Sequence, residues 1–291
     1  NHGMIRLVFI LFFMIIIGAL SWVVPKIYLM TLVLGTGIPH IILGAKYSKS
    51  GLSLAFNVFW KKAFVLMLLP LSFILGIKLG ALGLVFYFAL HHSISETYSH
   101  KSLFEKNIFF NFAYGSLVLS SYLIACRDDF LKYKFLNYGC YVVFVISLIV
   151  LIILTRKHLF KLDSIKLLLV YHPWLLGAPV LCLFTFFSPI SWMVLILYHF
   201  AFWGMLPIFR RDIFKGNKSR LDMFWNDAIK WNGLGVLGIG LLAWWSTRFG
   251  DFRLFQGVAL LFYIATYWHI TISFIISGAN PPFIKRLFFT K

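Results

Sequence analysis

The chain has 291 residues, of which 61% are hydrophobic, 19% aromatic and only 12% charged, and its formal net charge is +18. A soluble domain carries about 25% charged residues, so this composition excludes an ordinary soluble protein and predicts a multi-pass membrane protein. Basic loops beside membrane helices explain the excess of lysine and arginine, so the charge does not indicate a nucleic-acid partner.

Apolar runs of about 20 residues, the length that crosses a bilayer, recur along the whole chain. We predict an all-α, polytopic membrane helix bundle of about ten transmembrane helices. The predicted spans are residues 5–24, 27–45, 60–77, 79–99, 107–125, 138–155, 166–187, 190–209, 232–248 and 254–277. Residues 1–3, which precede Met4, resemble vector-derived residues, and we expect residues 4–291 to form a single polytopic membrane domain.

The lysines and arginines divide unequally between the two sides of the membrane that ten spans would define. One side holds 20 of them and the other holds 7, which together account for the 27 in the chain. Because basic loops stay in the cytoplasm, both termini are predicted to be cytoplasmic, and the protein is predicted to span the cell (inner) membrane. The longest predicted loop, residues 210–230, is basic and is expected to lie along the inner leaflet.

Six histidines lie within the predicted spans, where an ionisable side chain is costly and needs a partner or a purpose. They are His40, His91, His92, His172, His199 and His269. Neutral imidazole is the commonest ligand of iron, zinc and copper, so all six are candidate metal ligands. Counted along the predicted spans, histidines of five helices fall at one level, from the middle of the bilayer to its cytoplasmic half. A shared depth favours a metal site, although a single histidine can also serve as a hydrogen-bonding partner between helices.

The predicted helix 79–99 carries the densest group of ionisable residues. His92, Glu96 and His100 are spaced by four residues and therefore share one face, whereas His91 points about 100° away from His92. Among the nine acidic residues, Glu96 alone falls within a predicted span. It is the candidate catalytic carboxylate, either as a metal ligand or as a group that orients a ligating imidazole.

The segment Gly37-Ile38-Pro39-His40 resembles the Gly-Leu-Pro-His signature of the Brp/Blh family. Later residues follow a similar order: His92 with Glu96, His172 before Pro173, His199 within a helix, and His269 after Trp268. Members of that family are integral-membrane, iron-dependent dioxygenases that cleave β-carotene centrally to retinal. The resemblance implies an enzyme with an Fe(2+) cofactor, held by the candidate histidines, that uses O2 to cleave a carotenoid to an apocarotenoid such as retinal.

This chain also departs from the family pattern at two places. Residues 41–44 replace the Gly-Ala and Asp that usually follow the signature, and Trp203 stands where the family tends to carry a second histidine. A carotenoid dissolves in the bilayer, so we expect a pocket that opens toward lipid and is lined by aromatic side chains. The candidate lining residues, all neighbours of candidate ligands, are Tyr198, Phe202, Trp203 and Trp268.

Two other functions stay open from the sequence. The adjacent His91 and His92, with Glu96 and His100, also resemble membrane di-iron desaturases and hydroxylases of lipids, which need about eight histidines and two irons per chain. A metal or small-molecule transporter is the third alternative, although transporters often show internal repeats and none is found here. Beyond the bilayer, O2 and a lipid-soluble small molecule, the sequence indicates no obligate protein partner.

Overall fold

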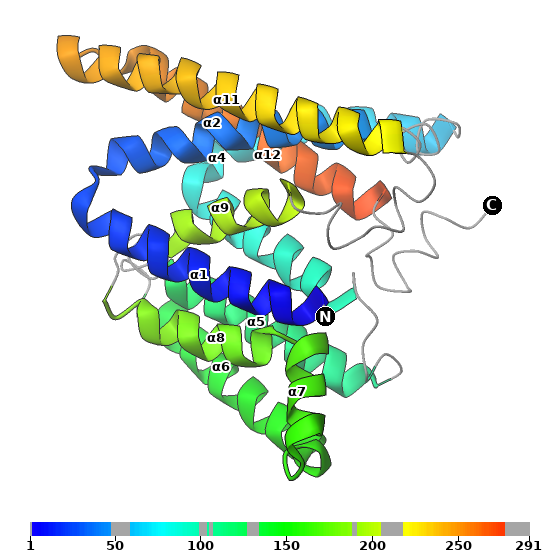
Figure 1. The fold of residues 1–291 in the computed structure, drawn as a ribbon. Helices are drawn as coiled ribbons and strands as arrows, with labels where there is room; N and C mark the ends of the chain where they lie inside the picture. The colour runs from blue at the N-terminus through cyan, green and yellow to red at the C-terminus, as the bar shows by residue number, and fades with distance from the viewer. Residues whose placement is uncertain are drawn as a thin grey trace. The chain divides into compact units, whose positions relative to one another are not determined.

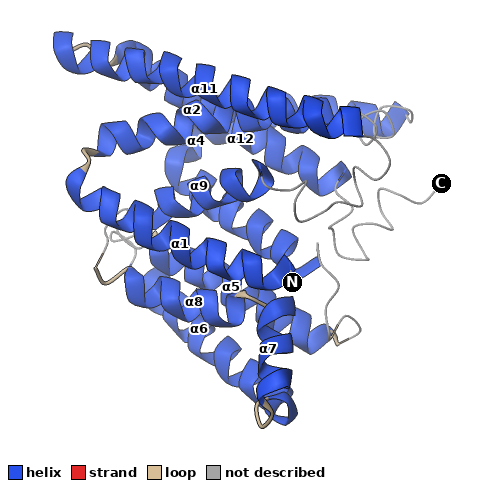
Figure 2. Ribbon diagram, viewed as in Figure 1, coloured by secondary structure: helices blue, strands red, loops and turns tan. Residues whose placement is uncertain are grey.

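Helices form all the regular structure in the part of the chain that the computed structural model describes (Figure 2). The described residues are 2–47, 59–98, 104, 107–126, 134–187, 191–204 and 218–276. The helices are α1 (His2–Val23), α2 (Lys26–Tyr47), α4 (Phe59–Tyr98), α5 (Ile108–Ala125), α6 (Lys134–Thr155), the short 3-10 helix η2 (Arg156–His158), α7 (Leu162–Tyr171), α8 (Trp174–Phe184), α9 (Ser191–Gly204), α11 (Lys218–Phe249) and α12 (Arg253–Ile276). The all-α prediction is confirmed for these residues.

Several of the described helices are long and apolar enough to cross a membrane. By length and composition, four stretches meet this condition: Lys26–Tyr47, Ile108–Ala125, Phe135–His158 and Arg253–Ser273. The bent pair α7 and α8 makes a fifth if it counts as one span. These stretches overlap predicted spans and are consistent with a membrane protein. The number of ten spans and the cytoplasmic termini stay predictions.

The segment from Phe59 to Tyr98 differs from its prediction. The sequence predicts two helices, over residues 60–77 and 79–99, whereas the structure has the single helix α4. The residues that join the two predicted helices include Lys78 and glycines but no proline. Nothing there removes a backbone N–H or blocks the helical conformation, so the hydrogen-bonded helix can continue.

Two further predicted boundaries differ from the structure. The predicted span 166–187 is broken into α7 and α8, which meet at 75°. Pro173 lacks a backbone N–H and disfavours the helical conformation for His172, whose φ of −131° and ψ of 65° end α7. The predicted loop 210–230 is also partly helical, because α11 already begins at Lys218.

The described chain divides into two compact units, each assembled from separate stretches of sequence. Unit 1 combines α1 up to Leu20 with the described residues from Val85 to Trp192. Unit 2 combines the described residues of Ser21–Leu84 with Met193–Ile276. Helices α5 to α8 therefore belong to unit 1, whereas α2, α11, α12 and nearly all of α9 belong to unit 2.

In unit 1, α5 packs against both α6 and α8. Asn107 caps the first turn of α5, since its side chain accepts a hydrogen bond from the Phe110 N–H at 3.1 Å. Farther along α5, the Gly115 carbonyl accepts a hydrogen bond from Ser93 Oγ of α4 at 2.6 Å. A Cβ on Gly115 would lie 3.2 Å from Thr97 Oγ1, so glycine allows α4 and α5 to approach closely.

In unit 2, α2 and α11 run antiparallel and side by side (Figure 1). Their backbones meet at Gly35 and Gly235. A Cβ on Gly35 would lie 2.7 Å from Val236 Cα, and a Cβ on Gly235 would collide with the Gly35 carbonyl oxygen. Small residues that let two backbones touch are the usual basis of tight helix pairing in membranes. The Gly35–Gly235 crossing therefore sets the distance between these two helices.

A second contact between α2 and α11 is polar and lies at the end of α2. Lys46 Nζ and Tyr47 Oη donate hydrogen bonds to Asp227 Oδ2 at 2.5 and 2.7 Å. Asp227 precedes the predicted span 232–248, and these hydrogen bonds, that from Lys46 most of all, hold the pKa of its carboxyl below the ordinary value. The charged form of Asp227 thus contributes to the pairing of the helices.

We expect Asp227→Asn to reduce the stability of the purified protein by about 0.5–1 kcal/mol, because the ion pair is partly exposed. The pKa of Asp227 is lower in the folded than in the unfolded protein. Its contribution is therefore present above about pH 4 and is lost as the pH falls through the lowered folded-state pKa. Thermal unfolding of both proteins at about pH 6 and about pH 3 checks this.

The matched control for this prediction is Asp222→Asn, which changes an exposed aspartate on the same helix. The difference between wild type and Asp227→Asn should shrink at the acid pH, while Asp222→Asn should behave like the wild type at both. A difference that stays the same at both pH values would show that the Asp227 charge does not stabilise the helix pair.

Candidate metal centre

Three of the six candidate histidines meet in unit 2. His40 of α2 is buried. Its ring centroid lies 5.1 Å from that of His199 on α9 and 5.2 Å from that of His269 on α12. In both pairs the rings are edge to face, with an interplanar angle of 73°. The three helices are distant in sequence, so the tertiary fold alone brings these imidazoles together.

The residues around His40 explain how two other helices can reach it. Gly37 and Gly44 lie about one turn before and after His40, on the same side of α2. A Cβ on Gly37 would lie 2.5 Å from Phe262 Cε2, and a Cβ on Gly44 would lie 3.1 Å from His269 Cε1. Any larger residue at these two positions would push the rings of α12 away from α2.

The distance of the His40 ring from each of the other two is compatible with ligands of one metal ion. Two imidazoles on a common ion have centroids about 5 Å apart, given metal–nitrogen distances of about 2.1 Å. In the conformation described, however, no group of three or more His, Cys, Asp or Glu among the described residues is arranged to hold a metal ion. Binding would require the imidazoles to turn about their side-chain bonds until their nitrogens face one point. The donor chemistry and the ring spacing fit a metal, and the present ring orientations do not.

Aromatic side chains surround His40 on the α9 side. The ring centroids of Phe200 and Trp203 lie 4.8 and 4.9 Å from that of His40. Trp203 also lies 5.3 Å from Phe224 of α11, within an apolar cluster that includes Leu43. The imidazoles are therefore flanked by apolar faces.

The predicted lining residues occupy different positions. Trp203 contacts the histidine cluster, and Tyr198 is buried on α9. Trp268 is half-buried on α12, and its Nε1 has no hydrogen-bond partner among the described residues. The side chain of Phe202 lies outside the described part of the structure. One of the four predicted residues is thus placed directly beside His40.

The remaining predicted site residues belong to unit 1. His92 and Glu96, one turn apart on α4, are both buried. His92 Nε2 lies 3.8 Å from Glu96 Oε1, too far for a hydrogen bond. The His92 ring centroid is 5.1 Å from that of Tyr122 on α5. His91 is half-buried beside His92, and His100 lies outside the described residues.

His172 lies at the break between α7 and α8 and is buried against α5. Its ring centroid is 4.7 Å from that of Phe110 and 5.1 Å from that of Tyr114. Tyr114 Oη also accepts a hydrogen bond from the Trp174 backbone N–H at 3.3 Å. These contacts fix the turn that holds His172.

Gly44 contacts His269, Tyr122 contacts His92, and Phe262 packs against Gly37, although no sequence motif singles out these residues. Gly44 lies four residues after His40, and Phe262 lies seven residues before His269, so helical periodicity alone places each on the face of its histidine. No comparable local signal points to Tyr122, because its contact with His92 joins two helices.

Comparisons of the chain with protein-family models, curated proteins and solved structures gave no match. The likeness to the Brp/Blh family therefore rests on the signature at residues 37–40 and on the order of the later histidines. The function must accordingly be argued from the site itself.

Proposed function

We propose that this chain is a membrane-embedded, non-haem iron oxygenase that uses O2 to cleave a lipid-soluble polyene of the carotenoid class. The observation that carries the proposal is the meeting of His40, His199 and His269, from three helices, beside aromatic rings. An imidazole set of this kind suits iron and leaves coordination positions for O2 and substrate. Bound Fe(2+) would supply the activation of O2.

The reaction is balanced without a further reductant. One C=C bond of the polyene breaks, and each of its two carbons forms a C=O bond with one atom of O2. The two carbons are oxidised and O2 is reduced by the same four electrons, so cleavage of a carotenoid yields two carbonyl products, such as retinal.

The residues of the chain itself would bind the polyene and exclude water. Phe200 and Trp203 lie against His40 and offer flat apolar faces to a conjugated chain. Gly37 and Gly44 leave room for rings beside His40, because Phe262 and Phe200 lie against Gly37 and His269 lies against Gly44. Aromatic surroundings of this kind favour a hydrocarbon substrate over a polar one.

A second candidate function is that of a di-iron desaturase or hydroxylase. The buried pair of His92 and Glu96, one turn apart in unit 1, favours it, because carboxylate and imidazole together are the usual donors of di-iron sites. Such an enzyme would bind two irons per chain and would consume an external reductant. An iron content of one per chain, with activity in the absence of reductant, favours the polyene oxygenase.

Expression in carotene-producing cells tests the proposed reaction. Cells that express the wild type should lose their orange colour and accumulate retinal, whereas cells that express His199→Ala should stay orange. Extraction and chromatography of the pigments measure both changes. Persistent colour in cells whose purified protein carries iron would rule out carotene as the substrate.

A further inference from the structure

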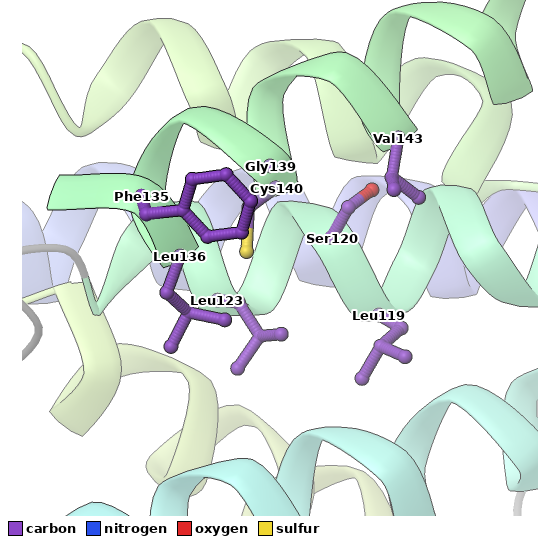
Figure 3. Close-up of a pocket in the computed structure, with 8 residues that line it drawn as sticks. All are labelled: Leu119, Ser120, Leu123, Phe135, Leu136, Gly139, Cys140 and Val143. Atoms are coloured by element: carbon purple, nitrogen blue, oxygen red, sulfur yellow. The ribbon is translucent and has the colours of Figure 1, made fainter. Parts of the chain in front are cut away.

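A second apolar site lies in unit 1, where α5 and α6 leave a groove between them (Figure 3). Its volume is about 290 Å³, and none of its lining residues is a candidate metal ligand. Helix α5 contributes Leu119, Ser120 and Leu123, and α6 contributes residues between Phe135 and Val143. The groove is therefore separate from the histidines discussed above.

Gly139 leaves one wall of the groove open. A Cβ at this position would meet no other atom within 4 Å, so the backbone of α6 is bare there. Phe135 and Leu136 lie at one end of the groove, and Val143 and Leu119 lie at the other (Figure 3). The groove thus follows the helix axis.

Ser120 adds no polar site to the groove. Its hydroxyl donates a hydrogen bond to the Ser116 carbonyl of its own helix at 2.7 Å. Nothing among the lining residues carries a charge, so the groove selects for hydrocarbon and offers no contact that would recognise a headgroup.

The groove is continuous with the face of α6 that would contact the bilayer. Within the candidate span Phe135–His158, a stretch of 18 residues has a mean hydropathy of 2.6, and only 17% of that stretch is buried. Exposed apolar residues continue along the helix beyond Val143: Ile146, Ile149, Ile152 and Ile153. The medium around the groove is therefore expected to be lipid hydrocarbon rather than water.

We propose that this groove is a binding site for one acyl chain of a membrane phospholipid. Its volume is at the lower end of the range for ligand pockets, which suits part of one unbranched chain. From Phe135 to Val143, α6 rises about 12 Å, less than half of the roughly 30 Å hydrocarbon core. That length accommodates part of one acyl chain, and because no lining residue is a candidate metal ligand, the site is independent of the proposed reaction.

Gly139→Leu tests the proposal, because the added side chain enters open space and should fill the groove without disturbing the fold. The matched control is Val142→Leu, which enlarges an exposed residue of the same helix outside the groove. The probe is a phosphatidylcholine with a photoreactive group at the end of one acyl chain, incorporated into vesicles with the protein. Mass spectrometry of the cross-linked peptides measures labelling of α5 and α6.

The wild type and Val142→Leu should be labelled equally, and Gly139→Leu should be labelled about tenfold less. Leu119→Phe narrows the groove from the α5 side and should reduce the labelling to the same extent. This second variant tests the proposal even if Gly139→Leu does not fold. Equal labelling of all four proteins would show only general contact with lipid and would overturn the proposal. Loss of labelling on addition of β-carotene would overturn the choice of a phospholipid chain as occupant.

Discussion

His40→Ala is expected to remove nearly all bound metal from the purified protein and to abolish the proposed oxygenase activity. His40 is the residue that links the cluster, since both His199 and His269 lie within 5.2 Å of it, centroid to centroid. Without His40 only two imidazoles remain. Loss of a residue that merely supports a ligand weakens metal binding about 10- to 100-fold, so loss of a ligand should weaken it by about 100-fold or more. Plasma mass spectrometry of the metal content measures this effect.

The control for His40→Ala is His158→Ala, because His158 lies on η2 in unit 1 and contacts Phe104 instead of the cluster. It should retain the metal content of the wild type. Thermal unfolding would show whether the cavity left by His40 destabilises the fold. A folded His40→Ala protein with the metal content of the wild type would contradict the assignment of His40 as a ligand.

Gly235→Ala should have the largest effect on stability, a loss of about 1–3 kcal/mol. Its Cβ would collide with the Gly35 carbonyl oxygen, and backbone cannot move aside as a flexible side chain can. Separation of α2 from α11 would also shift His40, so added metal should stabilise the variant less than the wild type. Thermal unfolding in detergent, with and without metal, measures both effects.

Gly233→Ala and Gly238→Ala are the matched controls, since a Cβ at either position meets nothing within 4 Å. Alanine is the better helix former, so these variants should equal the wild type or exceed it by about 0.5–1 kcal/mol. If Gly235→Ala behaves as they do, α2 and α11 do not meet at the Gly35–Gly235 crossing.

The candidate spans were the features most open to prediction from the sequence, because hydropathy and length are local properties. The predicted span 107–125 begins one residue before α5 and ends at the same residue. The predicted span 254–277 lies one residue later than α12 at both ends. The chemistry of proline also predicts a break at Pro173. The long apolar run favoured a single span over residues 166–187 instead, whereas the structure has two helices there. Local sequence therefore predicts where helices lie better than how they join.

The grouping of the histidines depended on information that local sequence lacks. The predicted depth supplies one coordinate for each residue along the membrane normal and says nothing about its direction around the bundle. His92 and His172 share the predicted level of His40 but belong to unit 1, whereas His199 and His269 pack against His40 in unit 2. The Gly35–Gly235 crossing was unpredictable for the same reason, since neither glycine identifies its partner.

X-ray absorption at the iron edge tests the central claim most directly, because it reports the atoms around the metal in the purified, Fe(2+)-loaded protein. We predict one iron per chain, with nitrogen ligands at about 2.1 Å. The spectrum should also show scattering from the outer atoms of the imidazole rings, and His269→Ala should show one ring fewer than the wild type. A protein that binds no iron, or that binds it through oxygen atoms alone, would contradict a metal centre formed by His40, His199 and His269.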